Sequence, residues 1–85
     1  MTYEVKITAT ALKERKRIDP SSRKRIDNAL KKLIENPRPP KSRKLAGRQL
    51  DWRVRVGDYR ILYEIDDDKA LVTVWRIAHR REAYR

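Results

Sequence analysis

The sequence predicts an α+β domain in which an antiparallel sheet carries two N-terminal helices on one face. Three observations support this class. Residues 51–65 alternate apolar and polar side chains with period two, which is typical of strands. Residues 2–8 and 70–77 alternate in the same way. Between residues 2–8 and residues 51–65, the chain has apolar residues at helical spacing. The predicted order is strand, helix, helix and then three strands, and it fills a single domain, residues 1–85.

The first half of the chain supplies the first strand and both helices. A helix over residues 11–18, with Thr8 or Thr10 as its cap, follows the first strand. Asp19 and Pro20 are a cap and a proline at the first helical position, and they predict a second helix that ends near Glu35. The apolar residues of this helix fall on one face, which should pack on the sheet; they are Ile26, Ala29, Leu30, Leu33 and Ile34.

The two strands within residues 51–65 form a hairpin around Gly57-Asp58, where glycine supplies the positive φ of a two-residue turn. The register set by this turn places Arg55 opposite Arg60, with Arg53 on the same face. Like charges opposite each other destabilise a sheet, so these arginines indicate either a bound anion or a solvated outer face. The helices should cover the other face, which carries Val54, Val56, Ile61, Tyr63, Val72 and Val74.

A basic loop and a last strand flank the hairpin. Pro37 ends the second helix, and further prolines keep the chain extended as it leads into the arginine-bearing strands. The loop offers four candidate RNA-binding residues: Lys41, Arg43, Lys44 and Arg48. If Ile65 pairs with Ala70 in the last strand, Trp75 lies across from Arg60, where packing is a more ordinary role for it than stacking on a base.

Composition points to polyanionic partners. The formal net charge is +11 and the pI is about 10.5, which favours nucleic acid first and an acidic protein second. An anionic membrane is less suited, because no helix combines a basic face with a strongly apolar one. The chain has no cysteine and one histidine, so no metal site and no cofactor are predicted. No membrane-spanning run or signal peptide is recognisable, and the expected location is the cytoplasm.

Two segments, LAGRQLDWRVRVGDYRILYEIDDD and IAHRREAYR, together with the order of elements, resemble the RelE-like toxins of bacterial and archaeal toxin–antitoxin modules. The resemblance covers essentially the whole chain. It implies a type II toxin that cleaves mRNA on the ribosome and so inhibits translation. It also implies a cognate acidic antitoxin in a toxin–antitoxin hetero-oligomer. Two alternatives remain: a poison of DNA gyrase, as in the ParE branch, and a non-catalytic basic nucleic-acid-binding module.

Carried over by position, the resemblance implies six catalytic residues: Arg53, Arg55, Arg60, His79, Arg80 and Tyr84. RelE-like nucleases direct a ribose 2′-hydroxyl at the adjacent phosphate without a metal ion, and guanidinium groups suit the dianionic transition state. Arginine is a poor base, so His79 is the best-suited candidate for proton transfer. Tyr84 would orient the 2′-hydroxyl or stack on the base, and Arg80 would neutralise or protonate the leaving oxygen. The family often has lysine where this chain has Arg53 and Arg55, which leaves the proton-transfer roles open.

Overall fold

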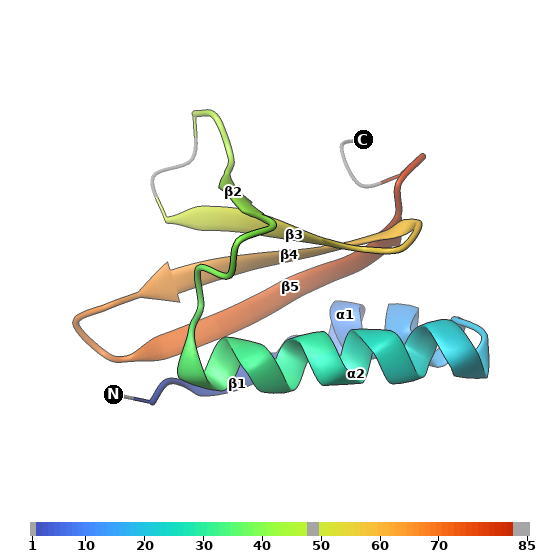
Figure 1. The fold of residues 1–85 in the computed structure, drawn as a ribbon, viewed down its shortest axis with the longest axis horizontal. Helices are drawn as coiled ribbons and strands as arrows, with labels where there is room; N and C mark the ends of the chain where they lie inside the picture. The colour runs from blue at the N-terminus through green and yellow to red at the C-terminus, as the bar shows by residue number, and fades with distance from the viewer. Residues whose placement is uncertain (1, 48–49, 83–85) are drawn as a thin grey trace.

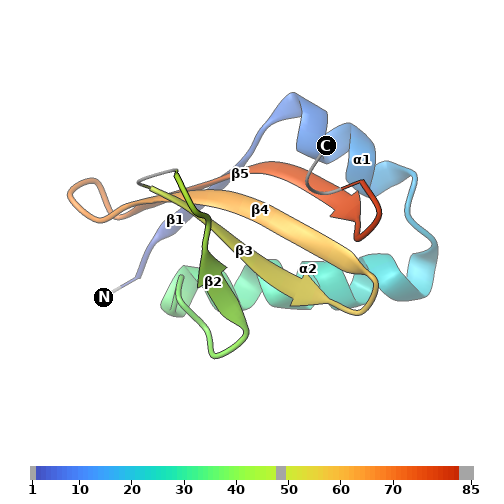
Figure 2. The same ribbon diagram turned by 90° about the horizontal axis from the view of Figure 1, so that it is seen from above.

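The computed structural model describes residues 2–47 and 50–82. Within them, a five-stranded sheet lies over two helices that both pack on one of its faces, which confirms the α+β class (Figure 1). The strands lie in the order β1-β5-β4-β3-β2 (Figure 2). Along the chain the elements are β1 (Glu4–Ile7), α1 (Ala9–Lys16), α2 (Pro20–Glu35), β2 (Ser42–Lys44), β3 (Asp51–Val56), β4 (Tyr59–Asp66) and β5 (Leu71–His79). No helix in this part of the chain is long and apolar enough to cross a membrane.

Both helices begin at side-chain caps. The Thr8 hydroxyl accepts a hydrogen bond from the Ala11 amide at 3.2 Å, so α1 begins two residues earlier than predicted. The Asp19 carboxylate accepts from the Ser22 amide at 3.0 Å, and Pro20 opens α2. The predicted limits of α2 are confirmed.

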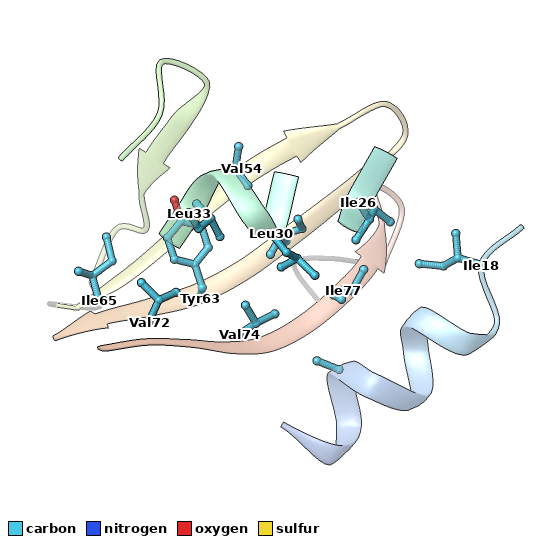
Figure 3. Packing of buried hydrophobic residues seen from close by; sticks show 12 residues of the cluster. Ile18, Ile26, Leu30, Leu33, Val54, Tyr63, Ile65, Val72, Val74 and Ile77 are labelled. Atoms are coloured by element: carbon cyan, nitrogen blue, oxygen red, sulfur yellow. The ribbon is translucent and has the colours of Figure 1, made fainter. Parts of the chain in front are cut away.

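The core lies between α2 and the three central strands. Figure 3 shows Ile26, Leu30 and Leu33 pointing from α2 toward the sheet, where the Tyr63 side chain is fully buried. The Tyr63 hydroxyl donates to the Pro37 carbonyl at 2.7 Å, and burial raises the pKa of Tyr63 to about 12, so the hydroxyl stays protonated. All six sheet residues predicted to face the helices belong to this core or pack against it.

The proline-rich linker after α2 is anchored to the sheet. Arg38 donates two hydrogen bonds to the Asp67 carboxylate, at 3.2 and 2.8 Å, and the Tyr3 hydroxyl donates to the same group at 2.7 Å. These contacts join the linker to β1 and to the β4–β5 turn. They direct the chain into β2, which pairs with β3. The sequence predicted a loop here, and the correction is a short edge strand over Ser42–Lys44.

The sheet is mixed, whereas the sequence predicted an antiparallel one. Strand β1 runs parallel to β5, with Glu4 opposite Leu71 and Ile7 opposite Val74. The remaining pairs are antiparallel. The alternation of β1 indicates a strand but carries no information about its neighbour. That neighbour is set by α1 and α2, which carry the chain across one face before the meander β2–β5 begins.

The register of β5 differs from the prediction at the β4–β5 turn and again at a β-bulge. Ile65 pairs with Val72 and not with Ala70, and the register shifts again where Leu62 and Tyr63 pair with Arg76 and Val74. The pairing at the turn already moves Trp75 away from Arg60 by two positions. The bulge, in which Trp75 is the extra residue, adds one more, so Arg60 pairs with Ala78. The bulge returns Ile77 to the core side, where it is 1% exposed.

Helix α1 completes the edge of β5 beyond the end of β1. The Glu14 carboxylate accepts from the Ile77 amide at 2.9 Å and from Arg76 Nε at 3.2 Å. The amide would otherwise have no strand beside it, because β1 pairs with β5 only over Leu71 to Val74. Glu14 therefore holds the residues that follow the bulge.

Replacing Glu14 with alanine should lower the free energy of unfolding by about 1–3 kcal/mol, because a half-buried amide loses its acceptor. Replacing Glu14 with glutamine should cost less, since the amide oxygen can still accept from Ile77. Urea unfolding of the two variants measures the difference. Equal losses would mean that the charge pair with Arg76, and not the amide bond, supplies the stabilisation.

An ion pair between the helices predicts a pH dependence of stability. Arg15 donates two hydrogen bonds to Asp27, each 2.7 Å long, and they hold the pKa of Asp27 below its ordinary value of 3.8 against the opposing effect of burial. A lowered carboxyl pKa stabilises the folded state above the ordinary pKa, and this stability is lost as the pH falls through the folded-state pKa. Asp27→Asn should therefore show a smaller loss of stability between about pH 5 and pH 2 than the wild type. Urea unfolding across this range tests it, with Asp68→Asn as the exposed control; equal acid losses in wild type and Asp27→Asn would contradict it.

Candidate functional site

The face of the sheet opposite the helices carries arginines in two cross-strand rows. In the first row, Arg43 of β2 pairs with Arg53 of β3, which pairs with Leu62, which in turn pairs with Arg76 of β5. In the second row, Arg55 pairs with Arg60, which pairs with Ala78. We call this surface the arginine face and define it by its five arginines: Arg43, Arg53, Arg55, Arg60 and Arg76.

Arg60 is the most buried charged residue of the arginine face, with 9% of its surface exposed. Its Nη1 donates to the Tyr59 carbonyl at 3.1 Å, while its buried Nε has no hydrogen-bond partner among the described residues. Arg55, directly opposite, adds a second positive charge. A guanidinium group is always charged, and burying it without full pairing is costly. An anion between Arg55 and Arg60 would relieve both the unpaired donor and the repulsion.

Leu62 forms an apolar floor within the arginine face. It is only 2% exposed, although neither of the two helices in the described residues covers this side of the sheet. Its cross-strand neighbours are Arg53 and Arg76, so long aliphatic stems flank it, and the charged end of Arg76 pairs with Glu14. Packing thus limits the freedom of these arginine stems.

Arg80 lies beside the hairpin turn that joins β3 to β4. Its amide donates to the Asp58 carbonyl at 2.7 Å, and its Nε is 4.0 Å from an Asp58 carboxylate oxygen. The backbone bond places Arg80 at the same end of the sheet as Arg55 and Arg60, which flank the turn. Its side chain remains 58% exposed, so an incoming anion can reach it.

His79 lies on the opposite side of the sheet from Arg60. It pairs with Tyr59, and the two rings meet edge to face with centroids 5.6 Å apart. Its Nδ1 accepts from the Arg81 amide at 3.3 Å, and its carbonyl accepts from the Glu82 amide at 2.8 Å. The structure therefore does not bring His79 together with the arginines, and its contacts shape the turn that follows β5.

Comparison with known proteins assigns this chain to a family. The family described as ParE toxin of type II toxin–antitoxin system, parDE, matches residues 5–84. The chain belongs to this family of toxins. Toxin RelG of Mycobacterium tuberculosis is 34% identical over 91 residues, covering 100% of this chain and 99% of that protein. The putative toxin RelE1 of Methanocaldococcus jannaschii is 30% identical over 88 residues, covering 100% and 98%.

Solved RelE structures share the fold of this type II toxin, which is RelE-like as the sequence predicted. The archaeal RelE–RelB complex from Pyrococcus horikoshii matches with a TM-score of 0.85 and 26% identity, covering 98% of this chain and 100% of that one. The intact RelBE toxin–antitoxin complex of E. coli matches with a TM-score of 0.80 and 25% identity, covering 91% and 95%.

The predicted RNA-binding residues of the basic loop do not share one surface of the toxin. Arg43 extends the arginine face, as its pairing with Arg53 shows. Lys44 pairs with Trp52, so it belongs to the other side of the edge strand. Lys41 lines a groove between α2 and β3. Arg48 and the predicted site residue Tyr84 lie outside the described residues.

Sequence reasoning missed Arg76 as a member of the arginine face. Strict alternation through β5 places it on the core side with Val72 and Val74, and only the bulge at Trp75 moves it to the other side. The available signal was a change of phase: Trp75 is apolar and Arg76 is charged, the reverse of what the preceding alternation predicts at these two positions. In the described part of the toxin, no group of three or more acidic, histidine or cysteine side chains could hold a metal ion.

Proposed function

We propose that this toxin is a ribosome-dependent mRNA endonuclease that inhibits translation. The observation that carries the proposal is the pair formed by Arg55 and Arg60. The two arginines are directly opposite on neighbouring strands, and Arg60 is buried with an Nε that has no partner within the described part of the chain. A phosphate group supplies both the negative charge and the acceptor oxygens that this arrangement lacks. The similarity of this toxin to solved RelE structures supports RNA as the molecule that supplies the phosphate.

In the proposed reaction, a ribose 2′-hydroxyl attacks the adjacent phosphorus and loses its proton to solvent. The bond to the 5′-oxygen of the next nucleotide breaks, that oxygen takes up a proton, and a 2′,3′-cyclic phosphate forms. Arg53, Arg55 and Arg60 bind the scissile phosphate and stabilise the two negative charges of the transition state. Arg80 neutralises the leaving 5′-oxygen, and Tyr84 orients the attacking hydroxyl.

Positioning carries much of this proposed catalysis. The arginine face itself is built from guanidinium groups, which do not act as bases. His79 lies on the other side of the sheet and contacts Tyr59, Arg81 and Glu82, so we assign it the role of shaping the turn that carries Arg80. An enzyme with weak proton-transfer groups depends on a substrate already held near its reactive shape, and the ribosome would supply that shape by binding the mRNA.

An acidic antitoxin is the proposed inhibitor. The neighbours from P. horikoshii and E. coli are complexes of RelE with RelB, and the charge of +11 on this toxin favours an acidic partner. We propose that the two proteins form a hetero-oligomer in the cytoplasm, where translating ribosomes are found.

A reconstituted translation reaction tests the nuclease directly. Wild-type toxin should cleave mRNA that is bound to ribosomes and leave free mRNA intact. Arg80→Ala should cleave about 10-fold to 100-fold more slowly, because a charge near the leaving oxygen is lost, while its binding to ribosomes changes little. Failure of the wild-type toxin to cut mRNA on active ribosomes would overturn the proposal.

DNA gyrase is the second candidate target, because the matching family is named for ParE. A gyrase poison would inhibit supercoiling of plasmid DNA in the absence of ribosomes. The same preparation of wild-type toxin should be inactive in that assay if the nuclease proposal is correct.

A further inference from the structure

The hairpin turn that joins β3 to β4 meets the end of β5 through one residue, Asp58. The Arg80 amide donates to the Asp58 carbonyl at 2.7 Å, and this bond lies one place beyond the last pair of the β4–β5 ladder, which it extends. Because side chains alternate along a strand, Arg80 comes next after Ala78, the partner of Arg60, on the side of the arginine face. The main chain of Asp58 therefore anchors Arg80 at the edge of the proposed site.

The side chains of the same two residues also approach each other. The Oδ1 atom of Asp58 lies 4.0 Å from Nε of Arg80, the nitrogen nearest the backbone in the guanidinium group. A guanidinium group has five N–H donors in a fixed fork, and the two Nη atoms carry four of them. A carboxylate beside Nε thus leaves the Nη donors for a phosphate. Arg80 is 58% exposed and Asp58 is 69% exposed, so this pair can restrain Arg80 without burying it.

The turn that carries Asp58 is itself held in place. Val56 pairs with Tyr59 across the turn. On the helix side, the Arg25 guanidinium packs against Gly57, where an added Cβ would lie 3.0 Å from Arg25 Nη1. The strand pair and α2 together fix the turn, so a side chain attached to it starts from a defined point.

We propose that Asp58 is a positioning residue for the reaction of the toxin. Its carboxylate holds the Nε side of Arg80, which leaves both Nη groups available to the phosphate bound by Arg55 and Arg60. An exposed arginine without such a partner samples many rotamers, and ordering it only when the substrate arrives slows catalysis. The inference rests on the proposed function, because Arg80 is the group assigned there to the leaving oxygen.

This role has opposite consequences for substrate binding and for chemistry. A carboxylate at the edge of the arginine face repels the phosphates of the substrate, so Asp58 should weaken binding slightly. The arginine that it positions should speed the chemical step, which depends on contacts made in the transition state. A residue that only supports the fold would change both quantities in the same direction.

The test measures single-turnover cleavage of ribosome-bound mRNA and the Kd of an uncleavable 2′-deoxy oligonucleotide. Asp58→Asn should cleave about threefold to fivefold more slowly, the range expected for an exposed ion pair. It should bind the oligonucleotide as tightly as the wild type does, or up to about twofold more tightly at low salt. The variant keeps the carbonyl that anchors Arg80, and Gly57 supplies the positive φ of the turn, so the backbone is not strained. Asp58→Glu, which restores the charge, should regain part of the rate.

Two comparisons separate this role from a general effect of charge. Glu82→Gln removes one negative charge from the turn that follows β5, where Glu82 is exposed and its amide donates to the His79 carbonyl. This control should cleave within about 1.5-fold of the wild type. In an Arg80→Ala background, Asp58→Asn should change the rate less than about 1.5-fold, because the arginine through which it acts is gone.

The order of the Arg80 side chain measures positioning without any RNA. NMR relaxation of Nε–H groups in the full-length toxin should give a higher order parameter for Arg80 than for Arg17, which is exposed at the end of α1. In Asp58→Asn the order parameter of Arg80 should fall to the level of Arg17. In Glu82→Gln it should stay at the wild-type value.

Three outcomes would overturn the inference: equal order of Arg80 with and without the Asp58 carboxylate, additive rate losses in the double variant, or weaker oligonucleotide binding that matches the loss of rate. The nuclease proposal is judged separately. A wild-type toxin that cuts no mRNA refutes the nuclease, while the order of Arg80 still decides whether Asp58 positions it. A toxin that cuts mRNA equally fast as wild type and as Asp58→Asn refutes the positioning role alone.

Discussion

Replacing Arg60 with alanine should reduce cleavage of ribosome-bound mRNA about 100-fold to 1,000-fold, the range expected when one preorganised donor to a transition-state anion is removed. Arg60 is expected to have the largest effect because it is the most buried arginine of the arginine face, at 9% exposed, and its Nε has no partner among the described residues. A desolvated charge interacts more strongly with an anion than an exposed one does. Single-turnover cleavage on purified ribosomes measures the chemical step without product release.

The matched control for this variant is Arg17→Ala, which removes the same charge from an exposed position at the end of α1. It should cleave within about twofold of the wild type, because exposed charges that are remote from the site contribute little to positioning and are screened by salt. Ribosome binding should be similar in both variants. If Arg17→Ala loses as much activity as Arg60→Ala, net charge and not the buried guanidinium group accounts for the loss.

The hairpin was predictable from the sequence alone because two local signals agreed. Alternation fixed which residues share a face, and Gly57, with a φ of 59°, fixed the turn. The predicted pairs Arg55–Arg60 and Arg53–Leu62 are confirmed. The opposed arginines could therefore be recognised as a candidate anion site before the fold was known.

The register of β5 and the side of the sheet that His79 occupies were not predictable in the same way. The bulge at Trp75 is held by Glu14, which is more than sixty positions away in the sequence. Long-range contacts of this kind leave no periodic signal. The errors in β5 have two causes: the β4–β5 turn is two residues longer than predicted, which moves Trp75 away from Arg60, and the bulge moves Arg76 to the other face.

The edge strand β2 was missed for a different reason. Its three residues, Ser42 to Lys44, are too few to show alternation, and prolines precede them. Its position depends on the linker contacts of Arg38 and Tyr63. This strand places Arg43, which the sequence predicted as an RNA-binding residue, beside Arg53.

Replacing Arg55 with glutamine should move activity and stability in opposite directions. Cleavage should fall about 10-fold to 100-fold, because one of the two guanidinium groups at the phosphate position is lost. The free energy of unfolding should rise by about 0.2–1 kcal/mol at low salt, since the repulsion across the strand pair disappears. The rise should shrink as salt is added. Urea unfolding at low and high salt, together with the cleavage assay, measures both effects.

An uncleavable substrate analogue extends the same argument to the bound state. A 2′-deoxy oligonucleotide at a concentration of 100 times its Kd should raise the unfolding free energy of the wild-type toxin by about 2.7 kcal/mol. The same concentration should stabilise Arg55→Gln less, because its affinity is weaker, and should stabilise the control variant Lys24→Gln, on the exposed side of α2, as much as the wild type. A variant at Arg55 that loses both stability and activity would show that the arginine supports the fold. Loss of activity with a gain in stability would show that the two opposed charges are retained for the anion they bind.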